Sequence, residues 1–273
     1  MLFRSVSWKR FINRFSTNSN IQIVRRVKND FKEDPSVKTP ISQWNPFQLD
    51  IPDAALAALT LNLRNSLFFN RNNPITDFEL GQTTVRNRVI VVTGYEERSN
   101  TAYFIKNRWN IGQQFTLLTN LSTGNQSNVS EAFSNRNYNI SQIKIEPDLT
   151  WIASENLRFG FNYKHRNGYN TLTVNKERIT NNDFAFESVW TKTTAAQLRA
   201  RFAIIKIRYD GERNTPVEFA LLEGLQTGRN LLWNLSYDQT LSRSILFSIS
   251  YEGRQTGAIR PVHVGRAQVR ATF

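Results

Sequence analysis

Apolar and polar residues alternate with a period of two along most of the chain from about residue 57. In the stretch 157–164, LRFGFNYK, Leu157, Phe159, Phe161 and Tyr163 occupy every second position. Neighbouring residues of a β-strand face opposite sides, so this pattern is typical of strands with one apolar and one polar face. It predicts an all-β chain of about eleven strands, with a range of ten to twelve. The expected strands are 58–69, 75–94, 100–110, 113–122, 138–152, 156–166, 182–192, 195–209, 230–239, 243–253 and 262–273.

One expected strand changes phase part-way along its length. In 195–209 the apolar row runs through Phe202 and Ile204 and then shifts by one residue to Ile205, Ile207 and Tyr209. An extra residue in one strand of a pair produces such a shift. The sequence therefore predicts a β-bulge near Ile204.

The connections between the strands alternate in length. Those expected at one end are short, and those at the other end are mostly longer. The short links are 70–74, 111–112, 153–155, 193–194 and 240–242, and the longer ones are 95–99, 123–137, 167–181, 210–229 and 254–261. Transmembrane β-barrels combine short turns on one side with long loops on the other. The pattern therefore favours an antiparallel up-and-down transmembrane β-meander that is part of a larger outer-membrane barrel.

Aromatic residues of the apolar rows gather near both ends of the expected strands. Amphipathic rings are best placed at the two boundaries between water and lipid. We expect two aromatic girdles, formed by Tyr95, Tyr103, Trp109, Trp151, Tyr163, Trp190, Tyr209, Trp233, Tyr251 and Phe273.

The polar rows are rich in charge and are expected to face the barrel lumen. One interpretation is an interior that prefers anions or guides a substrate. The other is a ladder of cross-strand ion pairs that stiffens the wall. The residues concerned are Arg64, Lys106, Arg108, Lys144, Glu146, Asp148, Arg158, Lys164, Glu187, Arg199, Arg201 and Arg270.

Composition excludes several kinds of site. The chain has 273 residues, a net charge of +13, no cysteine and two histidines, so neither thiolate chemistry nor a multi-histidine metal site is expected. Glu146 and Asp148 share a strand face, but no further acidic residues converge on them, and no catalytic, cofactor or metal site is predicted. Nucleic acid is not an expected partner, because the aromatic rings and the cations lie on opposite faces rather than on one stacking platform.

The first 57 residues differ from the rest. They are basic, and we expect a mostly irregular segment with at most one short helix, followed by the barrel region at 58–273. Trp8, Phe11, Ile12 and Phe15 fall on one helical face, which is compatible with a mitochondrial transit peptide or with a short amphipathic helix. A mitochondrial outer-membrane barrel thus stays an alternative.

The last expected strand carries an assembly signal. Ala267, Val269, Ala271 and Phe273 form an alternating row that ends on an aromatic residue, the kind of strand that barrel assembly machineries bind. Since eleven is an odd number and bacterial single-chain barrels have an even one, we also expect an unpaired sheet edge at 59–69 or 264–273.

Four stretches support a resemblance to a protein family. They are LFFNRNNP at 67–74, GYEERSNTAYFIKNRWNIGQQFTL at 94–117, FALLEGLQTGRNLLWNLSYDQTLSRSILFSISYEGR at 219–254 and HVGRAQVRATF at 263–273. Together they resemble the C-terminal part of large outer-membrane proteins of Bacteroidota, which are similar in setting to type IX secretion translocons. The resemblance implies a bacterial outer-membrane location, a C-terminal fragment, and the missing N-terminal part of the same protein as a partner besides lipid.

Two functions remain open from the sequence. The first is the wall of an outer-membrane transporter or protein translocon. The second is a membrane-anchored structural or surface-binding protein without transport activity. A soluble lipocalin-like barrel shares the alternation, but it does not account for aromatic residues at both strand ends or for the asymmetry of the links.

Overall fold

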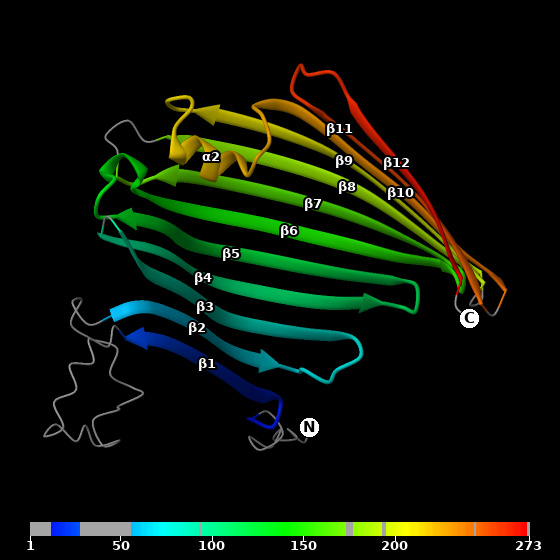
Figure 1. Cartoon of the computed structure of the whole chain (residues 1–273). Helices are drawn as coiled ribbons and strands as arrows, with labels where there is room; N and C mark the ends of the chain where they lie inside the picture. The colour runs from blue at the N-terminus through cyan, green and yellow to red at the C-terminus, as the bar shows by residue number, and fades with distance from the viewer. Residues whose placement is uncertain are drawn as a thin grey trace, which may run out of the picture.

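The computed structural model describes residues 12–27, 56–92, 94–172, 177–192, 195–242 and 244–271. Within these ranges one antiparallel sheet contains twelve strands, and each strand pairs with the strands that precede and follow it in sequence (Figure 1). The strands are β1 (Phe15–Val27), β2 (Leu56–Phe69), β3 (Thr76–Val91), β4 (Gly94–Ile111), β5 (Phe115–Ser130), β6 (Tyr138–Ser154), β7 (Leu157–Asn170), β8 (Arg178–Lys192), β9 (Ala196–Asp210), β10 (Gly228–Ser242), β11 (Ile245–Thr256) and β12 (Val262–Ala271). Two short helices complete the described part: η2 (Ser134–Arg136) and α2 (Pro216–Leu222).

The predicted all-β meander is confirmed, and β2 to β12 correspond to the eleven expected strands. Two expectations about local structure are wrong. Residues 15–27 are not irregular but form β1, which pairs with β2 along its whole length. The segment 95–99 is not a loop but the beginning of β4, and β3 and β4 are joined by residues 92–93. Residues 95–99 are mostly polar and show no apolar alternation, whereas 15–27 alternates only in part, through Phe15, Ile21 and Ile23.

The sheet is strongly curved and open. Among the described residues no pairing joins β1 to β12, and Figure 1 shows these strands at opposite ends of the sheet. The expected unpaired edge is therefore present, with β1 rather than β2 at one end. The odd strand number from which this edge was expected is wrong, because the described strands number twelve.

Within the described ranges, no helix is long and apolar enough to span a membrane.

The strand register runs without a shift through the middle of the sheet. Ile204 and Ile205 pair in sequence with Phe184 and Asp183 of β8, and the ladder from β9 to β10 is equally regular. The predicted bulge near Ile204 is therefore wrong. Ile205, Ile207 and Tyr209 lie instead on the polar side of the sheet, where α2 covers them.

The continuous register sorts side chains onto two faces. We call the side that carries Lys164, Asp183 and α2 the charged face, and the opposite side the apolar face. On the apolar face, one row across β7 to β10 consists of Tyr163, Phe184, Ile204 and Leu231. Pro147 interrupts the ladder between β6 and β7 without changing its register, because proline has no backbone N–H to donate.

Strands β3 to β6 are the longest of the sheet, with 16, 18, 16 and 17 residues. Near the end where β3 turns into β4, their apolar-face positions become polar. There Arg86 of β3 donates to Glu97 of β4 at 2.8 Å. The apolar band thus covers only part of the length of these strands.

Close approach of β4 and β5 explains one glycine. A Cβ atom at Gly124 would lie 2.1 Å from the backbone oxygen of Thr101, whereas a Cβ atom at Gly160 would meet the Glu187 Cβ at an ordinary 3.6 Å. We predict that Gly124→Ala lowers the free energy of unfolding by about 1–3 kcal/mol, as overpacking generally does. Gly160→Ala should leave it within about 0.5 kcal/mol of the wild type. Urea unfolding in detergent micelles, followed by tryptophan fluorescence, measures both, and equal midpoints would contradict the assigned contact.

Candidate functional site

The register gathers the predicted charged residues on one face of the sheet. They come from β2, β4, β6 to β9 and β12, and every one occupies the phase of the charged face. This face is therefore the candidate functional site. The residues are Arg64, Lys106, Arg108, Lys144, Glu146, Asp148, Arg158, Lys164, Glu187, Arg199, Arg201 and Arg270.

Several of these charges pair with residues on neighbouring strands. Arg64 of β2 donates to Glu79 of β3 at 2.8 Å, and Ser66 donates to the same carboxylate at 2.7 Å. Arg108 of β4 contacts Asp77 through Nε at 2.8 Å. These partners lie across a strand boundary, so the contacts couple adjacent strands as a ladder would.

The ladder continues at the centre of the sheet. The Lys164 ammonium lies 3.5 Å from Glu146, whose other oxygen accepts from Asn120 at 2.8 Å. Asn162 donates to Asp148 at 3.4 Å. Glu146 is thus engaged from both neighbouring strands, β5 and β7, and Asp148 from β7.

An aromatic ring between two cations is part of the same face. The ring of Phe104 is buried over Gly81, where an added Cβ would lie 2.4 Å from it. The Arg64 guanidinium lies 5.3 Å from the ring centre and the Lys106 ammonium 4.9 Å from it. The ring stabilises both cations and covers Gly81, which has no side chain.

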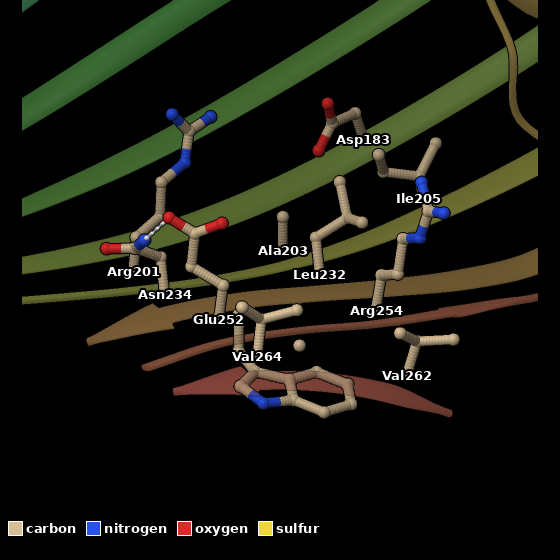
Figure 2. A pocket seen from close by; sticks show the side chains of 12 residues that line it. Asp183, Arg201, Ala203, Ile205, Leu232, Asn234, Glu252, Arg254, Val262 and Val264 are labelled. Atoms are coloured by element: carbon tan, nitrogen blue, oxygen red, sulfur yellow. Dashed lines mark hydrogen bonds between the residues drawn. The ribbon is translucent and has the colours of Figure 1, made fainter. Parts of the chain in front are cut away.

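Other cations of the charged face are not neutralised. Arg158, Arg201 and Arg254 are exposed, and within the described part of the chain their side chains make no hydrogen bond or ion pair. Arg201 and Arg254 line a hollow of about 570 Å³ over β8 to β12. Figure 2 shows them on either side of an apolar floor that includes Ala203 and Leu232.

The hollow also contains acidic and amide groups. Asn234 donates to Glu252 at 3.2 Å, the interaction drawn in Figure 2. Asp183 lies on the other side, and its Oδ1 atom is buried without a hydrogen-bond partner in the described part. Two free guanidinium groups beside an apolar floor suit an anion with an apolar portion. Arg254 was not among the predicted residues, because it was expected in the link 254–261, whereas β11 extends to Thr256.

Helix α2 covers one end of the charged face. Thr215 caps the helix by accepting from the Glu218 N–H at 3.0 Å, and Pro216 occupies the first turn, where its missing N–H costs nothing. Val217, Leu221 and Leu222 then pack on an apolar seat in the sheet. The seat consists of Ile140, Ile179, Ile205 and Ile207.

A single arginine fastens this helix to the sheet. Arg166 of β7 is only 1 % exposed, donates to the Leu221 carbonyl at 3.1 Å and forms an ion pair with Glu223. A cation at a helix C-terminus is favourable, because the last carbonyl groups lack helical partners. Sequence reasoning missed both Arg166 and α2, although the Thr215 to Glu218 spacing is a helix-start signal and the phase change at Ile205 marks the seat.

Tyr209 lies under the same cover, so its predicted place in a girdle is wrong. The Tyr209 side chain lies on the charged face, and its hydroxyl donates to the Glu212 carbonyl at 2.9 Å. Tyr209 follows Ile204, the last apolar residue on the apolar face of β9, by five residues. At this level, outside the apolar rows, burial raises the pKa of the phenol to about 12, and the nearby Glu177 and Glu218 carboxylates act in the same direction. The phenol therefore remains a neutral donor at neutral pH.

The other girdle residues within the described ranges lie on the apolar face. They are Tyr95, Tyr103, Trp109, Trp151, Tyr163, Trp190, Trp233 and Tyr251. Near the short turns, Trp151 continues into a row of rings, with Phe115 at 6.0 Å and Phe159 at 5.4 Å between ring centres. Phe273 lies outside the described residues, while Ala267, Val269 and Ala271 share the apolar face of β12.

Within the described ranges, no three His, Asp, Glu or Cys side chains come together as metal ligands would.

Comparisons with solved structures agree with this architecture. The siderophore receptor PirA from Acinetobacter baumannii superimposes with a TM-score of 0.60 and 8 % identity, over 95 % of this chain and 41 % of that one. The FrpB iron transporter from Neisseria meningitidis gives a TM-score of 0.52 and 12 % identity, over 88 % and 40 %. At these identities the likeness concerns the fold alone, which is that of an outer-membrane β-barrel wall, and the chain spans about two fifths of either protein.

No family model and no curated protein matches the sequence. The resemblance to Bacteroidota proteins and to secretion translocons therefore stays a prediction.

The contacts of Arg166 predict how α2 is held. Leu221→Cys would introduce the only cysteine in the chain, at a position that is 1 % exposed. Adding Arg166→Met should speed maleimide labelling of this cysteine about tenfold, because losing a buried hydrogen-bond donor costs about 1–3 kcal/mol. Arg158→Met, on the same strand and face but without a partner, is the matched control. Equal labelling rates in the two variants would show that Arg166 does not hold the helix.

Proposed function

We propose that the chain forms part of the wall of a transport β-barrel in the bacterial outer membrane. The observation that carries this proposal is the sorting of side chains by a register that stays constant through the middle of the sheet. Aromatic and aliphatic residues occupy one face, and the twelve predicted charges occupy the other. The fold likeness to a siderophore receptor and an iron transporter supports a role in transport.

The apolar face is the side that meets lipid. In hydrocarbon every backbone polar group needs a partner within the protein, and the antiparallel ladder provides one on both sides of β2 to β11. Lipid also explains why large side chains such as Tyr103, Ile143 and Phe184 are more than half exposed on this face. In water, so extended an apolar surface would promote aggregation.

The charged face lines the lumen and guides anionic solutes. Its acidic residues are largely engaged by neighbouring side chains, such as Glu79 by Arg64 and Glu146 by Lys164. Arg158, Arg201 and Arg254 remain free to attract a solute of opposite charge. Basic side chains that line a pore favour anions.

A closed wall requires further strands at β1 and β12. An unpaired sheet edge exposes N–H and C=O groups, which hydrocarbon cannot satisfy. The partners expected at these two edges are additional strands of the same protein and the barrel assembly machinery. The apolar row of β12, with Ala267, Val269 and Ala271, is the side that such a machinery would bind.

A second candidate function is supported by α2. Because Arg166 fastens this helix over the charged face, part of the lumen is narrowed at the end with the longer links. A barrel closed in this way would anchor a surface protein rather than conduct a solute. Solute permeability therefore distinguishes the two functions.

The orientation of the sheet is tested with single cysteines that carry a fluorescent probe. A probe at Phe159→Cys should be quenched by brominated lipid in vesicles, and a probe at the neighbouring Arg158→Cys should not. Strand neighbours face opposite sides, so the pair differs only in facing. In the same assay system, Phe159→Arg should destabilise the inserted protein by about 2–4 kcal/mol if it lies near the midplane. Quenching at Arg158 but not at Phe159 would reverse the two faces.

Transport is tested by flux through vesicles that contain the protein. We expect a small anionic dye to pass faster than a cationic dye of equal size. Arg201→Gln combined with Arg254→Gln should lower the ratio of the two rates several-fold, because both free cations of the hollow are removed. Arg25→Gln combined with Arg229→Gln, on the apolar-face side, keeps the same net charge and should not. Impermeability to both dyes would favour the anchoring function.

A further inference from the structure

Three cations stand at the edge of the apolar face on β9 and β10. The row Tyr163, Phe184, Ile204 and Leu231 ends the apolar positions of β7 to β10. Two residues further along each strand, the same face carries His165, Asn182, Lys206 and Arg229. Arg208 follows Lys206 on this face, opposite Thr180.

The fold itself does not explain these cations. Lys206 and Arg229 are direct cross-strand partners, and like charges in that arrangement are destabilising. Lys206, Arg208 and Arg229 are exposed, and their side chains make no ion pair or hydrogen bond within the described part of the chain. On this face of β7 to β10 the acidic residue in the described part is Asp210, which lies opposite Arg178. The site therefore carries an uncompensated positive charge.

An apolar hollow begins directly below the cations. The volume of the hollow is about 410 Å³. Three residues of the row next to the cations also line this hollow: Tyr163, Phe184 and Ile204. Pro147 also lines it, at the point where the ladder between β6 and β7 is interrupted. Two residues along a strand span about 7 Å. A lipid headgroup at the cations and the first part of its acyl chain in the hollow would therefore fit side by side.

We infer that Lys206, Arg208, Arg229 and this hollow form a binding site for an anionic lipid. The phosphate group of the lipid contacts the three cations, and an acyl chain occupies the hollow beside Phe184 and Ile204. Charge complementarity selects the headgroup, and the aromatic and aliphatic lining accepts the chain. The inference rests on the proposed contact of the apolar face with lipid, and it adds a defined partner to that face.

The test uses a fluorescent probe on Leu231→Cys, in the row next to the cations. The chain has no other cysteine, so the label is unique. The protein is inserted into phosphatidylcholine vesicles that contain equal mole fractions of brominated phosphatidylglycerol in one sample and brominated phosphatidylcholine in the other. We expect stronger quenching by the anionic lipid. Each cation removed should weaken the preference about fivefold, and Lys206→Gln, Arg208→Gln and Arg229→Gln together should abolish it.

Matched controls separate this site from a general effect of charge. Arg158→Gln, Arg199→Gln and Arg270→Gln remove three charges from the charged face and should leave the preference unchanged. Millimolar glycerol phosphate, which has the headgroup charge without acyl chains, should not displace the anionic lipid. Displacement would reduce the site to an anion site and overturn the lipid assignment. Equal quenching by both lipids in the wild type would refute the inference alone, whereas quenching by neither would refute the proposed contact of this face with lipid.

Discussion

Continuous antiparallel pairing across the sheet is the constraint on which the other features depend. Each strand satisfies the backbone groups of its neighbours, and the pairing fixes which residues lie opposite one another. A slip by one residue would move every side chain of a strand to the other face. The ladder keeps its register even at Pro147, where one donor is missing. Because the register holds, Arg64 meets Glu79 and Arg108 meets Asp77 on one face.

The strand pattern was predictable because alternation is a local property of the sequence. It failed where the alternation is incomplete. The strand at 15–27 has polar residues in both phases, and 95–99 is a run of mostly polar residues, yet both belong to the sheet. The apolar residues do change phase at Ile205, but no bulge is involved. From Ile205 onward they face α2, a helix that begins more than ten residues later in the sequence. Only the folded chain brings α2 onto that seat.

The charged face was predictable as a set, but its internal contacts were not. Phase alone places Lys164 and Glu146 on one side of the sheet. Whether they meet depends on the stagger between β6 and β7, which alternation does not reveal. Arg166 looked like one more strand cation, although it is the group that fastens a helix. The free pair Arg201 and Arg254 likewise emerges only when β9 to β11 are placed side by side.

The length of β3 to β6 changes what a solute would meet outside the membrane. An 18-residue strand tilted by about 40° rises about 45 Å, whereas the apolar band of an outer-membrane barrel is about 25 Å tall. The part of these strands that extends beyond the apolar band is a paired β-sheet in water rather than a set of mobile loops. The side chains of its pair Arg86 and Glu97 are partly exposed to water, so salt weakens their attraction and the backbone ladder carries most of the rigidity. An approaching molecule would therefore first touch an ordered, polar rim on this side of the wall.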